Sequence, residues 1–94
     1  MTDVSRKLPG HELVSGGLAD LSAGRESEAS LLVTMAAPRL RALGFDVPPS
    51  ERVDASHRLY ELLTEHHDGA HSRYNALVGR MVSFVRAAEH ASAR

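Results

Sequence analysis

The 94-residue sequence contains no cysteine, which excludes disulfide bridges, zinc-thiolate sites and thiol catalysis together. No apolar run approaches the ~18 residues that a membrane-spanning helix needs. The longest such run, Ser30 to Leu43, is interrupted by Pro38 and by two arginines. The first residues, Met1 to Pro9, lack the apolar stretch of a secretory signal peptide. We therefore expect a cytoplasmic protein that makes no membrane contact.

Aromatic residues are scarce, with no tryptophan, two phenylalanines and two tyrosines. The core must therefore be built from leucine, valine, methionine and alanine. Such side chains suit the ridges and grooves of packed helices, whereas strands favour β-branched and aromatic residues. A chain of this length forms one domain. The composition predicts an all-α fold.

Net charge is also small, at −1, which argues against a general binder of polyanions. All but one of the 11 basic residues are arginine, a bias typical of a GC-rich bacterial genome. The charges are unevenly distributed along the chain, because the segment from Gly69 to Arg94 carries several arginines but only one acidic residue, Glu89. The end of the chain is therefore locally basic.

The clearest pattern is an apolar stripe near the C-terminus, with residues spaced by three and four: Tyr74, Leu77, Val78, Met81, Val85 and Ala88. This spacing predicts an amphipathic helix over Ser72–Ala91, with Ser72 as a candidate N-cap. A second helix, capped by Asp54 or Ser56, precedes it and carries His66 within its apolar arc. The pair Asp68-Gly69 separates the two helices. We predict an antiparallel helical hairpin at the centre of the fold.

Weaker signals predict the remaining helices. A helix over His11–Ala23 contains Gly16-Gly17, which weaken it by about 1 kcal/mol each relative to alanine. Ser27 is a good N-cap for a further helical stripe that continues to Gly44. Pro38 either kinks that helix or begins another. We predict a disordered segment over residues 1–10 and a single domain over 11–94, a compact bundle of four to five helices.

A second stripe on the last helix consists of small residues: Ser72, Ala76, Gly79, Ser83 and Ala87. Small residues permit close helix approach, so the stripe is either an exposed surface poor in charge or a contact site, for another helix of this chain or for a partner. The predicted interaction residues are Arg73, Ala76, Gly79, Arg80 and Ser83. No phosphate loop, cofactor fingerprint or nucleophile-base pair is present. We therefore predict a non-catalytic protein-protein interaction or accessory module, without a cofactor, that binds an unknown protein or itself.

A nucleic-acid-binding domain is the first alternative. Arg73 and Asn75 lie at the N-terminal end of the last helix, where a recognition helix reads base edges, and Arg80 shares the flank of Arg73. Such binding would weaken steeply with salt. The turn does not match a helix-turn-helix, because Glu65 and Asp68 fall where small or apolar residues should pack.

A metal-dependent or HEPN-like ribonuclease is the second alternative. His66, His67 and His71 form a cluster with metal-ligating side chains, although the His-Glu-x-x-His spacing is absent. Histidines in the last turn of a helix also interact favourably with its negative end. His66 alone could act as a base. Arg52 and His57 form an Arg-x4-His pair that resembles the Arg-x4–6-His signature of HEPN ribonucleases. In that family the pair lies in a late helix of a larger bundle, whereas here it lies where a linker meets a helix.

Overall fold

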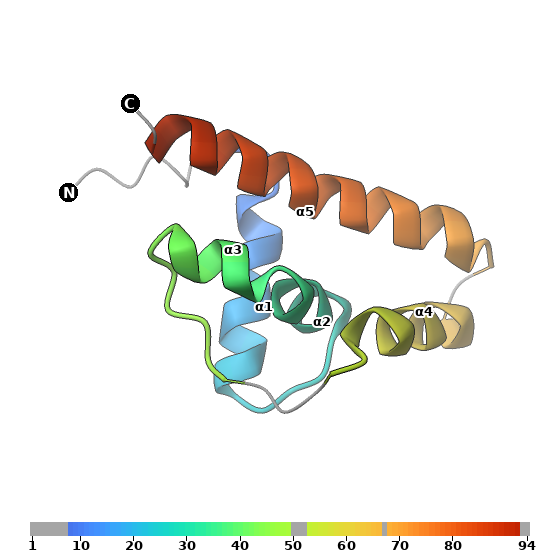
Figure 1. Cartoon of the computed structure of the whole chain (residues 1–94). Coiled ribbons are helices and arrows are strands. Elements are labelled where there is room, and N and C mark those ends of the chain that lie inside the picture. Colours follow the sequence, from blue (N-terminus) through green and yellow to red (C-terminus); the bar gives the residue numbers. More distant parts are fainter. Residues whose placement is uncertain (1–7, 50–52, 67, 93–94) are drawn as a thin grey trace.

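The regular structure of this protein is helical throughout the residues that the computed structural model describes, 8–49, 53–66 and 68–92. The helices are, in chain order, α1 (His11–Ser22), α2 (Glu28–Met35), α3 (Ala37–Ala42), α4 (Ala55–His66) and α5 (Ala70–Ser92). Figure 1 shows α5 lying across the other helices, with α4 folded back beneath its first turns. The all-α bundle of four to five helices is thus confirmed.

Helix α2 is the most enclosed element. Its consecutive residues Ser30, Leu31, Leu32 and Val33 are all buried. Successive side chains of a helix point in directions about 100° apart, so four in a row leave no face uncovered. α2 contacts α1, α3, α4 and α5, and it lies in the middle of the fold in Figure 1. α4 and α5 therefore both pack against α2, which lies at the centre of the core.

The two glycines of α1 have different surroundings. Gly17 is buried, and a Cβ atom there would lie 2.5 Å from the carbonyl oxygen of Ala29 in α2. Gly16 is exposed, and a Cβ atom there would meet nothing within 4 Å. Gly17 thus permits the close approach of α1 to α2. A helix that is weak by propensity is held in place by this packing.

The start of α2 is fixed by a capping box. The Ser27 hydroxyl accepts a hydrogen bond from the backbone N–H of Ser30 (3.0 Å), and the Ser30 hydroxyl accepts one from the N–H of Ser27 (2.8 Å). These bonds satisfy donors that would otherwise lack partners at a helix N-terminus. The predicted N-cap at Ser27 is confirmed.

Pro38 separates two helices. α2 ends at Met35, and Ala36 is at once its C-cap and the N-cap of α3, which has Pro38 in its first turn. The missing N–H of proline is harmless there. After α3, the Arg41 guanidinium donates hydrogen bonds to the carbonyl oxygens of Val47 (3.2 Å) and Pro48 (3.3 Å). Arg41 thereby holds the extended segment before α4, and Val47 is buried.

Helices α4 and α5 form the predicted hairpin. Asp54 directly precedes α4, and Gly69 turns the chain with a φ of 71°, a conformation that favours glycine. The rings of Tyr60 and Tyr74 then meet across the pair, with centroids 5.6 Å apart. α5 begins at Ala70, two residues before the prediction, so Ser72 lies within the first turn and is not the N-cap. The turn is complete at Gly69, so α5 can begin at the next residue, Ala70.

The predicted stripe of α5 faces the core, and its largest fully buried neighbour, Phe84, lies outside the residues predicted for the stripe. Leu77, Met81, Val85 and Ala88 are buried, and so is Phe84, which is 0% exposed. The Phe84 ring packs against that of Phe45, with centroids 5.9 Å apart. Phe84 widens the buried arc toward the start of α1, where a Cβ atom on Gly10 would lie 3.3 Å from the Phe84 Cβ.

The N-terminal segment is described only from Leu8 onward. Leu8 packs against the core, and Gly10 is buried. The rest of the segment predicted to be disordered, residues 1–7, lies outside the described residues. Within the described residues, no helix is both long enough and apolar enough to cross a membrane.

Candidate functional site

The basic residues at the start of α5 are paired with acids of neighbouring helices. Arg80 Nη2 donates a 2.6 Å hydrogen bond to Glu12 Oε1 of α1, and Arg73 Nη2 lies 3.4 Å from Glu28 Oε1 of α2. Both arginine side chains are nearly half exposed. The charges of Arg73 and Arg80 are therefore balanced within the molecule, and the two pairs tie α5 to α1 and α2.

The stripe of small residues lies on the exposed back of α5. Ala76, Gly79 and Ser83 are all exposed, and a Cβ atom on Gly79 would meet nothing within 4 Å. Of the two kinds of contact site predicted for the stripe, packing against another helix does not occur within the described residues. Binding of a partner there stays a prediction.

Beside this stripe, an open hollow of about 160 Å³ runs between α5 and the α2–α3 segment. We call it the groove. One wall comes from α2 and the start of α3: Leu32, Met35, Ala36 and Arg39. The other wall comes from α5: Val78, Met81, Val82 and Val85. Met35, Val78 and Val82 are only half-buried, so the groove presents apolar surface to solvent.

The groove has a charged rim. Arg39, the one polar side chain among the described residues that line it, forms a bidentate pair with Glu89 of α5, with Nε–Oε2 and Nη2–Oε1 distances of 3.1 and 2.7 Å. The hydrogen bonds from Arg39 lower the pKa of Glu89, and the charge of Arg86 adds to the effect. Arg86 is exposed and lies one helical turn beyond Val82. Two cations and one anion therefore stand at this end of the groove.

The sequence contained one signal for the groove that went unused. Val78 belongs to the predicted buried stripe, whereas Val82 lies outside it. Val82 lies one turn after Val78, which makes the apolar arc of α5 wider than a single stripe. When the apolar arc of a helix is wider than its contact with the core, part of its apolar surface remains available to bind another molecule. The wall supplied by α2 could not be foreseen, since it depends on how the helices cross.

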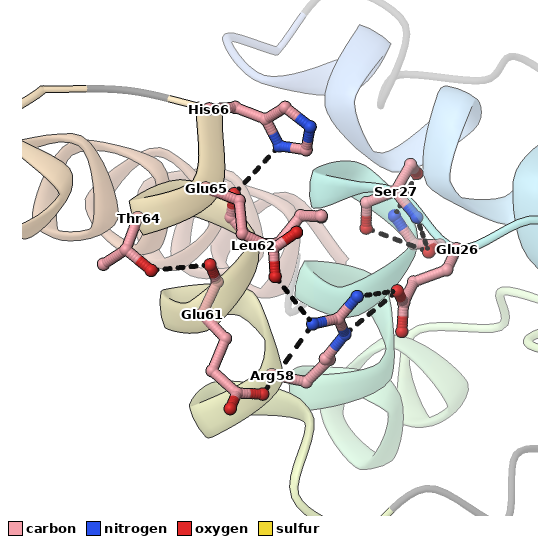
Figure 2. Close-up of polar contacts among 9 residues, drawn as sticks. Glu26, Ser27, Arg58, Glu61, Leu62, Thr64, Glu65 and His66 are labelled. Carbon is pink, nitrogen blue, oxygen red and sulfur yellow. Dashed lines mark hydrogen bonds and ion pairs between the residues drawn. The ribbon is translucent and has the colours of Figure 1, made fainter.

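A second hollow, of about 250 Å³, lies between the α1–α2 turn and the segment before α4. Its polar side chains are already engaged. The hydroxyls of Ser30 and Thr34 donate to backbone carbonyl oxygens at 3.0 and 2.9 Å. Glu26 accepts two hydrogen bonds from Arg58 of α4, at 3.0 and 2.7 Å. Figure 2 shows Arg58 between Glu26 and the acids of its own helix. These contacts join α4 to the start of α2.

The described histidines of the predicted cluster, His66 and His71, have different neighbours. His66 shares the angular position of the apolar arc of α4 but is exposed, and its Nδ1 lies 2.9 Å from the Leu62 carbonyl oxygen. His71 Nε2 lies 3.2 Å from Asn75 Nδ2. His67 lies outside the described residues, and the described ones contain no group of three metal-ligating side chains.

Of the Arg52–His57 pair that resembles the HEPN signature, His57 alone lies among the described residues. The His57 side chain is 74% exposed, with its Nε2 atom 3.6 Å from Glu61 Oε2. Arg52 lies outside the described residues, so the Arg52–His57 site stays a prediction.

No protein-family model, curated protein or solved structure matches this chain. Its functional hypotheses therefore rest on its own geometry.

Proposed function

We propose that this protein is a non-catalytic protein-protein interaction or accessory module, and that it binds an apolar side chain of a partner in the groove. The observation that carries the proposal is the half-exposed set Met35, Val78 and Val82, which lines one open hollow. Apolar surface gathered in a hollow with a polar rim is typical of a binding site. Methionine adapts its shape readily, which suits a surface that accepts another protein's side chain.

The chemistry of the rest of the molecule supports a non-catalytic role. The polar side chains of the larger hollow are already bonded within the protein, as Ser30 and Thr34 illustrate. The described histidines point to different partners, with His66 bonded to a backbone carbonyl and His71 near Asn75. A general base needs a reacting group within hydrogen-bond reach, and neither ring has a nucleophile beside it among these contacts.

Nucleic-acid binding is less well supported. Arg73 and Arg80 would have to exchange Glu28 and Glu12 for phosphates. That exchange would loosen α5 from α1 and α2 as the ligand bound. Phosphate contacts contribute most when the cation has no other partner.

The test is affinity purification of the tagged full chain from its native cells, with the recovered proteins quantified by mass spectrometry. The variants are Val82→Gln and Ser83→Gln, which place the same side chain at adjacent positions. Val82 lines the groove and Ser83 lies on the exposed back of α5. We expect a stoichiometric protein partner with the wild type and with Ser83→Gln, and its loss with Val82→Gln. Circular dichroism checks that both variants are folded.

Three outcomes would overturn the proposal. Recovery of no stoichiometric protein removes its basis. Loss of the partner with Ser83→Gln but not with Val82→Gln would move the site to the small residues Ala76, Gly79 and Ser83. Recovery of nucleic acid without a protein, lost when Arg73 and Arg80 are changed to alanine, would establish the nucleic-acid alternative.

A further inference from the structure

The size of the groove limits its occupant. Its volume of about 160 Å³ is close to the ~150 Å³ of an engineered cavity that holds one benzene molecule. One leucine or phenylalanine side chain would therefore fill it. A stable dimer interface needs roughly 20–30 residues from each partner, far more than line this hollow. The groove by itself is thus suited to a short segment of another protein rather than to a second copy of this chain.

The shape of the groove favours a helical segment. Val78, Val82 and Val85 follow one another at spacings of four and three along α5, which corresponds to a length of about 10 Å at 1.5 Å per residue. The opposite wall is also helical. A third helix laid between two others can insert one side chain between their ridges, as amphipathic helices do in grooves of this kind.

The rim determines the sign of the partner's charge. Arg39 and Glu89 neutralise each other in their bidentate pair. The charge of Arg86, which stands one turn beyond Val82, also acts on Glu89, so two guanidinium groups lie near this one carboxylate at the same end of the groove. A carboxylate on the partner would give Arg86 a counter-ion at the edge of an apolar contact, where water is partly excluded.

We propose that the groove binds an acidic amphipathic helix of another protein, which inserts one large apolar side chain beside Val82 and places a carboxylate against Arg86. This inference rests on the proposed function and adds the class of partner. The whole chain carries a net charge of −1, so a preference for an acidic ligand would come from the rim and not from the total charge.

Two synthetic peptides of 14 residues test the inference. Both carry leucine and phenylalanine on one helical face, and the polar face is glutamate in one peptide and lysine in the other. Fluorescence anisotropy with the full chain measures their affinities at low salt. We expect the glutamate peptide to bind about tenfold more tightly than the lysine peptide. Val82→Gln should abolish binding of the glutamate peptide, whereas Ser83→Gln should leave it unchanged.

Arg86 is tested in the same assay. Arg86→Ala should weaken binding of the glutamate peptide by about threefold, and Arg86→Glu should make the lysine peptide the tighter ligand. Arg86 is exposed, so neither variant should lower the thermal stability enough to explain these changes.

The outcomes separate the two proposals. Equal or tighter binding of the lysine peptide to the wild type, lost with Val82→Gln, would overturn the acidic partner while supporting the groove as a binding site. Binding of neither peptide would overturn the helical occupant, and the purification experiment would still decide the proposed function. Self-association in analytical ultracentrifugation, lost with Val82→Gln, would make the occupant a second copy and overturn the inference.

Discussion

Gly17 lies so close to Val33 that a side chain at position 17 would collide with it. A Cβ atom on Gly17 would lie 2.5 Å from Cγ2 of Val33 and equally close to the carbonyl oxygen of Ala29. The obstacle at Ala29 is backbone, which a rotamer change cannot move. α1 and α2 therefore share a contact that depends on the absence of one carbon atom.

The neighbouring glycines should respond oppositely to alanine. Gly17→Ala should lower the free energy of unfolding by about 2 kcal/mol, because the helices must separate. Gly16→Ala should raise it by about 0.5–1 kcal/mol, because the new methyl group enters open space and helix propensity improves. Urea denaturation measures both values. Destabilisation by both changes would mean that α1 does not dock in this register.

Ser27 and Asp20 should make stability depend on pH. The Ser27 hydroxyl donates a 2.6 Å hydrogen bond to Asp20, and this bond, with that from Arg25, lowers the pKa of the carboxyl group. A pKa lowered by folding stabilises the protein above the unfolded pKa, and the contribution is lost as pH falls through the folded value. Stability should therefore decline below about pH 4. Asp20→Asn should flatten this decline.

Loss of the Ser27 cap is a separate test of the same turn. Ser27→Ala removes the acceptor for the Ser30 N–H and the donor to Asp20. We expect a loss of about 1 kcal/mol in the free energy of unfolding, measured by urea denaturation at pH 7. Ser27→Asp should keep the cap acceptor but bring a second carboxylate against Asp20. A fully stable Ser27→Asp variant would contradict the described contact between residues 20 and 27.

The caps and turns show how far the sequence could be read. Ser27, Pro38 and Gly69 act through their own backbone neighbours, so the ends of α2, the start of α3 and the hairpin turn were predicted or reduced to two alternatives. Gly17 and Phe84 act through residues distant in the sequence. Their roles appear only when α1 meets α2 and when α5 meets Phe45. The contact of Gly17 leaves no trace in local periodicity, whereas Phe84 fits the three-and-four spacing of the α5 stripe, and only its partner Phe45 could not be foreseen.

The candidate site was less predictable than the fold. Arg73 and Arg80 look like a basic surface in the sequence, because Glu28 and Glu12 lie 45 and 68 residues away. The small residues around Gly79 do lie on an exposed face, as a partner-binding stripe requires. The groove has two walls that lie far apart in the sequence, and Val82 is the one sequence signal for either of them.

Phe84 should be the costliest single truncation in α5. It is fully buried and packs on Phe45, so Phe84→Ala leaves a cavity that costs about 3–5 kcal/mol. In a domain of this size such a loss approaches the whole stability. Phe84→Leu retains most of the volume and should remain folded at 25 °C. Thermal denaturation followed by circular dichroism measures the difference, and equal melting temperatures for the wild type and Phe84→Ala would contradict the burial.

Arg58 should couple α4 to the start of α2. Its Nε and Nη2 atoms both donate to Glu26, and these hydrogen bonds raise the pKa of the guanidinium. Lysine has no planar fork to reproduce the two bonds. Arg58→Lys should therefore unfold at a lower urea concentration than the wild type. In a double-mutant cycle with Glu26→Gln, the favourable coupling should shrink as salt is added. A cycle without coupling would show that the contact contributes nothing.

The enclosure of α2 determines when this protein can become stable during its own synthesis. α1 precedes α2 in the chain, but α4 and α5, which also contact α2, are made after it. A nascent chain that stops before α5 leaves Leu32 and its neighbours exposed to solvent, or to a chaperone. No contiguous fragment can shelter them, so the amide protons of α2 should exchange with solvent only through opening of the entire domain.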